Sequence, residues 1–307
     1  MKASSIHLYG SEMRGARVSG ALLHEVLCAL LEGAKRAVRL QLEGRSVAPG
    51  HSPAWLDAAA RFDLVGIAEG STLLQLEART LTEAVPEQFR QVEMFSSLDP
   101  DSTCLDLLGD ALDDALDARD SENYDDGLLE ALQKLQKLSA HGVTKVDFVT
   151  RRRITFDDER IRGLAVLKRS IAADQRTILA GKLDAIRHSD RMFTLNVQGV
   201  GAVRGVFTDA IPSGVIGTFW GAAVRIAGLA KFRPSGAVQR IEAESIEAAS
   251  DADVAIWSSM PRPISRDLDL RVLRKSQGPR SGVAAVFGQW PGDESEDEVQ
   301  RALAELS

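Results

Sequence analysis

Hydrophobic and polar residues alternate in five runs between residues 174 and 248. A period of two is the spacing of half-buried strands, and turns that carry glycine are typical between such strands. The interval from Asp209 to Trp220 does not alternate and has room for a short helix. The five runs are 177–187, 192–197, 202–208, 223–232 and 237–246. They predict a small closed β-barrel, with Val206 and Ile226 on the register that faces its core.

The N-terminal residues 1–90 combine helical and strand patterns. Ser19 can cap a helix whose leucines recur three and four residues apart as far as Leu31. The pattern then predicts a strand at 37–42, a short helix near 54–60 and a hairpin of strands 62–67 and 72–78. We therefore expect an α+β unit in this part of the chain.

Residues 91–172 are expected to be mainly helical, with one short hairpin. Leucines recur at helical spacing from 105 to 116 and from 128 to 138, where Gly142 supplies a stop signal. Segments 143–149 and 152–156 can pair as a hairpin, and Asp157 or Asp158 can cap the next helix.

The predicted fold class is α+β, in four parts along the chain. These parts are an α+β unit at 1–90, a mainly helical segment at 91–172, an OB-like barrel at 173–249, and an extended basic segment with a C-terminal helix at 250–307. The barrel resembles an oligonucleotide/oligosaccharide-binding (OB) fold, because three strands, an insertion and two strands follow in that order. The resemblance implies a binding function more than a catalytic one.

Composition favours an ordinary globular protein. Apolar residues make up 44% of the 307 and charged residues 26%, as in soluble domains. The longest apolar stretch, around 20–33, contains His24, Glu25 and Glu32 and is too short and too polar to span a bilayer. The N-terminal residues lack the apolar core of a secretory signal. Cys28 and Cys104 lie in helical apolar patterns, where we expect buried, reduced thiols. We expect a cytoplasmic protein.

Charge is segregated along the chain, although the net charge is only −7. Residues 91–130 hold one Arg or Lys against 13 Asp and Glu, a net −12, whereas residues 176–248 hold nine against six, a net +3. Residues 293–307 hold one against six, a net −5. Such segments can screen one another or present separate surfaces to separate partners.

No catalytic constellation emerges from the motifs. His24-Glu25 begins like a zinc-protease helix, but Cys28 stands where the second His is needed. Gly199-Val200-Gly201 lies between two strands and is interpreted as a turn. The acidic cluster of Asp110, Asp113, Asp114 and Asp117 could hold a divalent cation, although a solvated helix face is the favoured reading. We expect no catalytic residues, no metal and no cofactor.

Cationic residues decorate the predicted barrel and suit single-stranded nucleic acid, which binds along basic grooves with aromatic platforms. The candidate nucleic-acid-binding residues are Arg187, Arg191, Arg204, Arg225, Lys231 and Arg233. The aromatic supply is small. Phe193 and Phe207 fall on the apolar register, while Phe219, Trp220 and Phe232 could lie inside or outside. The alternative is a set of solvated arginines on a barrel packed against its neighbours.

The C-terminal residues 287–307 read FGQWPGDESEDEVQRALAELS. Asp293 can cap a short helix with a narrow apolar stripe, a segment too small to fold without docking on another surface. The string W-P-G-D-E followed by an acidic amphipathic helix resembles the tails of antitoxin-like bacterial proteins that pair with PIN-domain ribonucleases. The whole chain also resembles bacterial proteins of unassigned activity in which an α/β part precedes a barrel. The candidate partner-binding residues are Trp290, Val299, Leu303, Leu306, Arg271 and Arg274.

Two functions follow from these patterns. The first is a non-enzymatic interaction protein whose tail engages a protein partner such as a PIN-type ribonuclease. The alternative for the tail is docking on the domains of its own chain. The second is a single-stranded nucleic-acid-binding protein that acts through the barrel. An enzyme is a third reading for which no site can be assembled.

Overall fold

The structure is a computed structural model that describes residues 1–11, 15–68, 72–88, 98–187 and 190–263. Contacts divide the chain into a compact unit at 1–266 and a second unit at 267–307. The predicted C-terminal helix and the six candidate partner-binding residues lie outside the described residues.

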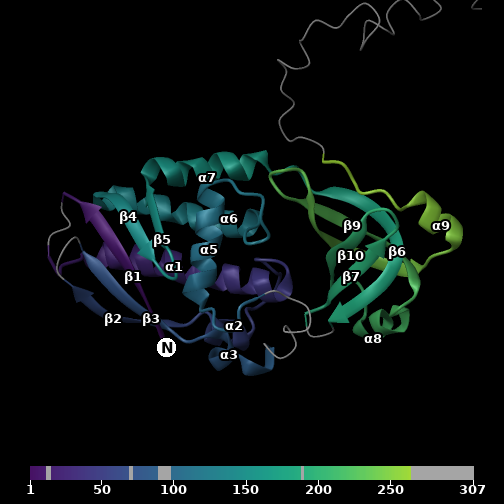
Figure 1. The fold of residues 1–307 in the computed structure, drawn as a ribbon, viewed down its shortest axis with the longest axis horizontal. Coiled ribbons are helices and arrows are strands. Elements are labelled where there is room, and N and C mark those ends of the chain that lie inside the picture. The colour runs from purple at the N-terminus through teal and green to yellow at the C-terminus, as the bar shows by residue number, and fades with distance from the viewer. Residues whose placement is uncertain (12–14, 69–71, 89–97, 188–189, 264–307) are drawn as a thin grey trace, which may run out of the picture. The chain divides into compact units, whose positions relative to one another are not determined.

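The first half of the compact unit contains a five-stranded antiparallel sheet in the order β2-β3-β1-β4-β5 (Figure 1). Its strands are β1 (Lys2–Gly10), β2 (Phe62–Ala68), β3 (Leu73–Ala78), β4 (Val143–Val149) and β5 (Arg153–Asp157). The first strand in the chain is the central one, because β1 pairs with β3 on one side and with β4 on the other. The two predicted hairpins are confirmed as β2-β3 and β4-β5.

Helices pack on one face of this sheet and share its core. They are α1 (Gly20–Glu43), α2 (Ala54–Ala59), α3 (Leu81–Ala84), α5 (Cys104–Leu116), α6 (Asp126–Gln133), the 3₁₀ helix η1 (Lys134–His141) and α7 (Asp158–Ser170). The buried strand side chains on that face include Ile6, Leu8, Leu74, Leu76, Val146, Phe148, Ile154 and Phe156. These side chains and the apolar stripes of the helices form a single cluster, so burial of both surfaces stabilises the layer.

Helix ends follow the predicted capping signals. The Ser19 hydroxyl accepts a hydrogen bond from the Leu22 amide at the start of α1, and Asp157 caps α7 through the Arg160 amide. Gly142 ends η1 in the left-handed conformation, at φ 76°, which glycine adopts without a steric penalty. The last part of the second leucine repeat is 3₁₀ rather than α-helical.

The predicted strand at 37–42 is wrong, because these residues form the last turns of α1. Val38, Leu40 and Leu42 alternate with polar residues, which imitates a strand. The helix continues because Ala34, Ala37 and Val38 extend the buried stripe that begins at Leu22. It ends only at Gly44, which is left-handed at φ 69°.

The expected boundary near residue 90 does not separate two cores. Strand β4 lies beyond that boundary and pairs with β1, which lies before it. The same hydrophobic cluster runs from Ile6 to Ile171. Residues 1–172 therefore share one sheet-and-helix layer.

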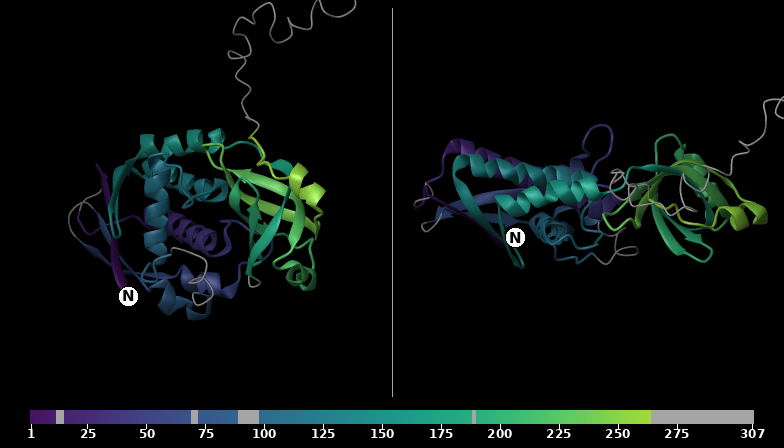
Figure 2. Two further views of the ribbon diagram at one scale, coloured as in Figure 1. Left: turned by 45° about the vertical axis from the view of Figure 1, so that its right-hand side comes forward. Right: turned by 90° about the horizontal axis from the view of Figure 1, so that it is seen from above.

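The predicted five-stranded barrel is confirmed (Figure 2). Its strands are β6 (Gln175–Arg187), β7 (Met192–Val197), β8 (Gly201–Phe207), β9 (Ala223–Phe232) and β10 (Val238–Ala248). The order around the barrel is β10-β8-β7-β6-β9, closed, with a parallel pair only between β10 and β8. The expected short helix between the third and fourth strands is α8 (Ser213–Ile216), followed by the 3₁₀ turn η2 (Gly217–Phe219). A short helix, α9 (Asp251–Ile256), follows the barrel and contacts β6 and β9.

Aromatic packing fills the barrel where one strand lacks a side chain. Phe193 and Phe207 are buried, as predicted, with ring centroids 4.4 Å apart. Gly205 pairs with Phe193 across β7 and β8, and a Cβ at residue 205 would overlap the Phe193 ring. The glycine therefore makes room for the aromatic side chain.

The predicted core register is right for Ile226 and wrong for Val206. Both side chains are buried, but only Ile226 belongs to the cluster inside the barrel. Val203 and Phe207 point inward from β8, and alternation along the strand turns Val206 to the outside. There its Cγ2 atom lies 3.8 Å from the position that a Cβ on Gly44 would take. Val206 is buried because residues at the end of α1 cover this part of the barrel wall.

Candidate functional site

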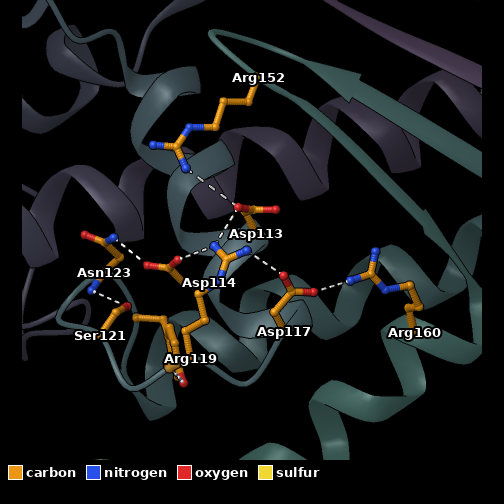
Figure 3. A network of polar contacts seen from close by, with 9 residues as sticks. Asp113, Asp114, Asp117, Arg119, Ser121, Asn123, Arg152 and Arg160 are labelled. Carbon is orange, nitrogen blue, oxygen red and sulfur yellow. Dashed lines mark hydrogen bonds and ion pairs between the residues drawn. The ribbon is translucent and has the colours of Figure 1, made fainter.

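The acidic end of α5 forms an ion-pair network around one arginine (Figure 3). The Arg119 guanidinium donates to Asp113 at 2.7 Å and to Asp114 at 2.9 Å through Nη1, and to Asp117 at 2.5 Å through Nη2. Arg160, on α7, donates to the other oxygen of Asp117 at 2.6 Å. Three of the four carboxylates that could have held a cation are therefore already neutralised by arginine.

Electrostatics around this network favour a charged carboxylate at Asp114. Burial raises its pKa, but hydrogen bonds from Ser121, Asn123 and Arg119 outweigh burial, so the pKa of Asp114 lies below its ordinary value. The three acceptor carboxylates in turn raise the pKa of the Arg119 guanidinium. No group of three or more His, Cys, Asp or Glu in the described part of the chain is arranged to hold a metal ion.

Arg151 is a second arginine that contacts several carboxylates, near the start of α5. It donates to Asp99 at 2.7 Å and to Asp110 at 3.0 Å, and its Nε lies 3.5 Å from Asp106. Burial raises the pKa of Asp110, and the charge of Arg151 opposes that rise. The fourth member of the acidic cluster is thus also paired, but with a different arginine from the other three.

Cys28 is exposed, in contrast to the prediction, and its sulfur lies 3.6 Å from His24 Nε2 on the outer face of α1. Cys104 is buried as predicted, and burial raises the pKa of its thiol to about 12. A thiol with so high a pKa is protonated at neutral pH and is not an activated nucleophile.

Two of the six candidate nucleic-acid-binding residues are structural. Arg187 is buried, pairs with Asp190 and donates to the Leu42 carbonyl at the end of α1. Arg191 adopts φ 61° and donates to the Phe207 carbonyl at 3.0 Å and the Thr208 carbonyl at 2.6 Å. Its guanidinium therefore satisfies backbone groups in the connection between β8 and α8.

Two more of the candidates pair with acids of the barrel or its flanks. Arg225 donates to Glu247 at 2.5 Å and to Asp253 at 3.4 Å. Lys231 pairs with Asp174 and lies 3.6 Å from Glu242. These pairs keep both cations on the barrel surface without a free charge.

The last two candidates contact the connection between α5 and α6, residues 117–125, here called the acidic loop. Glu122 accepts a hydrogen bond from Arg204 at 2.5 Å with one oxygen and from Arg233 at 2.8 Å with the other. Asp120 accepts a hydrogen bond from the Ser235 hydroxyl at 2.9 Å. The acidic loop thus lies on β8 and on the turn between β9 and β10.

A buried contact continues the same interface on β10. Arg240 donates to Asp125 at 3.1 Å, and these side chains are only 11% and 4% exposed. Asp125 also caps α6 through the Leu128 amide and accepts from the Ser46 amide. Next to this pair, the Gln239 side-chain amide donates to the Tyr124 carbonyl at 2.9 Å. This part of the acidic loop is a buried contact with the barrel.

A cavity of about 320 Å³ adjoins the acidic loop and the outer wall of the barrel. Its charged lining consists of Arg151, Arg187, Arg204, Arg240, Asp99, Asp110 and Glu122. Four positive and three negative side chains leave it close to neutral, and each arginine already has an acidic partner. The charged lining of this cavity is therefore part of the ion-paired contact between the sheet-and-helix layer and the barrel.

The barrel has an exposed tryptophan among the candidate aromatic residues. Trp220 is 72% exposed and donates through Nε1 to the Asp184 carbonyl at 3.3 Å. Phe232 is buried, and Phe219 packs partly against the barrel core. A stacking platform for a base would have to use Trp220, because stacking needs an open aromatic face.

The sequence prediction missed the residues of the acidic loop that meet the barrel. Asp120, Glu122 and Asp125 were counted only as part of a block with a net charge of −12. The signal that could have found them is the juxtaposition of that block with a basic barrel in one chain.

Comparison of the chain with protein-family models, curated proteins and solved structures finds no significant match. Within the described residues, no helix is long and apolar enough to cross a membrane. The case for a function therefore depends on the residues and contacts given above.

Proposed function

We propose that this chain is a non-enzymatic interaction protein, antitoxin-like in its tail, that binds a PIN-type ribonuclease in the cytoplasm through residues 287–307. The observation that supports a separate role for the tail is its own sequence, in which W-P-G-D-E precedes an acidic helix pattern with a narrow apolar stripe. The anchors are Trp290, Val299, Leu303 and Leu306, with Arg271 and Arg274 in the segment before them. An apolar helix stripe flanked by charge suits insertion into a groove.

The test is co-purification with coexpressed PIN-type ribonucleases from the same genome. Deletion of residues 287–307 should abolish capture and leave the melting temperature of the purified protein nearly unchanged. Leu303→Asp should have the same effect, because it places a charge on the apolar stripe. Ala304→Asp is the matched control, since residue 304 lies on the opposite side of an ideal helix and should retain capture. Loss of stability on deletion, with capture retained, would contradict the proposal.

A second candidate function is binding of single-stranded nucleic acid by the barrel. The observation that favours it is a cluster of three arginines that each hold a carboxylate: Arg204 on β8, Arg233 at the turn between β9 and β10, and Arg240 on β10. OB folds bind oligonucleotides on their second and third strands and on the loop between the fourth and fifth strands, which correspond to this region.

Titration with a labelled oligonucleotide at low and moderate ionic strength tests this function. Binding should be modest and should weaken steeply with salt, because it depends on the displacement of counterions from phosphates. Tight binding that ignores salt, or no binding at low salt, would remove this candidate.

A further inference from the structure

We infer that Glu122 and Asp120 of the acidic loop cover the surface on which the barrel binds single-stranded nucleic acid. The acidic loop thereby competes with nucleic acid for this surface within the same chain. This inference rests on the second candidate function. The surface consists of Arg204, Arg233 and Ser235 and is here called the covered face. The proposed ligand of the covered face is the phosphate backbone of a single strand.

Chemical complementarity identifies the kind of partner. The covered face binds two carboxylates two residues apart in the loop, through two guanidinium groups and one hydroxyl. Guanidinium and hydroxyl groups are also the usual donors to phosphate oxygens. An extended polyanion can therefore replace the loop carboxylates by equivalent hydrogen bonds.

Differences in burial show which contacts can exchange. Asp125 and Arg240 are 4% and 11% exposed, so their pair is locked in the structure. Glu122 and Arg204 are 54% and 55% exposed, so solvent and ions reach both groups, whereas Arg233 is 17% exposed and is the less accessible cation of the covered face. Exposed pairs contribute little to stability, and a competing anion can open them at low cost. The outer part of the acidic loop is thus exchangeable while the inner part holds the two cores together.

Arg204 makes the effect measurable. Glu122 is its acidic partner among the described residues, whereas Arg233 also lies 4.0 Å from Asp120. Glu122→Gln removes the competing charge without changing the size of the side chain. We expect oligonucleotide affinity at low salt to rise about three- to tenfold. The slope of log affinity against log salt should steepen by about 0.7, the value for one additional phosphate contact on a single strand, because Arg233 still has Asp120 beside it.

The matched control is Glu247→Gln. Glu247 is 60% exposed and pairs with Arg225 at 2.5 Å, the same distance as between Glu122 and Arg204, but it lies away from the acidic loop. The two variants change the net charge equally, and each removes the carboxylate nearest to a barrel arginine, although Asp253 remains 3.4 Å from Arg225 in Glu247→Gln. We expect Glu247→Gln to bind like the wild type. An equal gain in both variants would overturn the inference, because it would show an effect of net charge alone.

Arg204→Gln supplies the second measurement, in the full chain. It should change affinity little in the wild type, where Glu122 holds the arginine, and should cancel most of the gain in the Glu122→Gln background. If the wild type binds and Glu122→Gln binds no better, the inference fails and the nucleic-acid function stands. If the wild type and both glutamine variants all fail to bind at low salt, the function fails and the inference with it.

Discussion

Arg119 and Arg204 both bind carboxylates of the same acidic segment, but over very different distances along the chain. Arg119 meets Asp113 and Asp114 six and five residues away, whereas Arg204 meets Glu122 across 82 residues and Arg233 meets it across 111. The first network shapes the end of one helix, and the second joins two hydrophobic cores. A block of acidic residues in a sequence can therefore serve two separate structural purposes at once.

The two sets of contacts also differ in how accessible their charged groups are to a competing ligand. The carboxylates around Arg119 share its guanidinium, and Arg152 and Arg160 contact Asp113 and Asp117, as Figure 3 shows. The carboxylates of the acidic loop meet several cationic or hydroxyl groups of the barrel, and the half-exposed pair of Glu122 and Arg204 lies beside the buried pair of Asp125 and Arg240. The network around Arg119 centres on one guanidinium, whereas the contacts on the barrel can be separated into a buried part and an exposed part.

The largest expected effect comes from the core of the barrel, because ion pairs on its surface cannot replace the stability that apolar burial provides. Ile226→Asp places a charge in a fully buried position and should cost several kcal/mol, on the order of the whole stability of a small domain. Val200→Asp is the control, because Val200 is 45% exposed, and should melt close to the wild type. Circular dichroism on heating measures both, and a cooperative, nearly unchanged melt for Ile226→Asp would refute the register.

The next effect separates the buried contact from the rest of the acidic loop. Asp125→Asn retains an oxygen for the Leu128 amide but removes the acceptor of the Ser46 amide and of Arg240 Nη1, while Glu242 still accepts from Nε and Nη2 of Arg240. We expect a loss of about 3 kcal/mol in the free energy of unfolding, because buried donors are left unpaired. Asp125→Ala should lose about 1 kcal/mol more through the missing helix cap. Equal losses in urea titrations of the two variants would argue against the assigned capping role.

A smaller, pH-dependent effect tests the local network. The pKa of Asp114 is lower in the folded protein than the ordinary value of 3.8, so its charged form stabilises the fold. That contribution is present above pH 3.8 and is lost as the pH falls through the lowered folded value. The stability difference between the wild type and Asp114→Asn should therefore be present at neutral pH and shrink under acid. A difference that grows toward low pH would reverse the sign of the argument.

The smallest effect is expected on the exposed side of the barrel contact. Glu122→Gln should change the free energy of unfolding by less than about 1 kcal/mol, because Glu122 and Arg204 are half-exposed and the less exposed Arg233 still has Asp120 4.0 Å away. Urea denaturation at low and high salt measures this change, and the difference should decrease as salt screens the pair. A loss as large as that of Asp125→Asn would show that the outer contacts are as fixed as the inner one.

Much of the fold could be predicted from local patterns, because burial on one face produces a regular period. The five barrel strands and both hairpins followed their alternating residues closely. Strand β1 was missed because Ser4 occupies one of its buried positions and only Ile6 and Leu8 supply an apolar signal. Residues 37–42 were misread because alternation over six residues is too short to distinguish a strand from the end of a long helix.

The candidate site could be predicted only in part. The sequence locates the barrel cations, but which acid meets each of them depends on how the two cores pack. Glu122 contacts Arg204 and Arg233 across 82 and 111 residues of sequence, and no local spacing indicates contacts at such separations. Residues 287–307 are predicted from their own pattern and lie outside the described residues.

The central position of β1 has a consequence for synthesis of the protein. Strand β1 is made before β4, and β1 pairs with β4 across more than a hundred intervening residues, as Tyr9 and Asp147 do over 138. Until β4 leaves the ribosome, the nascent sheet has an open hydrogen-bonding edge in what will become its centre. Such an edge can pair with another chain, so slow translation between residues 80 and 140 would lengthen the period in which the unfinished protein is prone to aggregate.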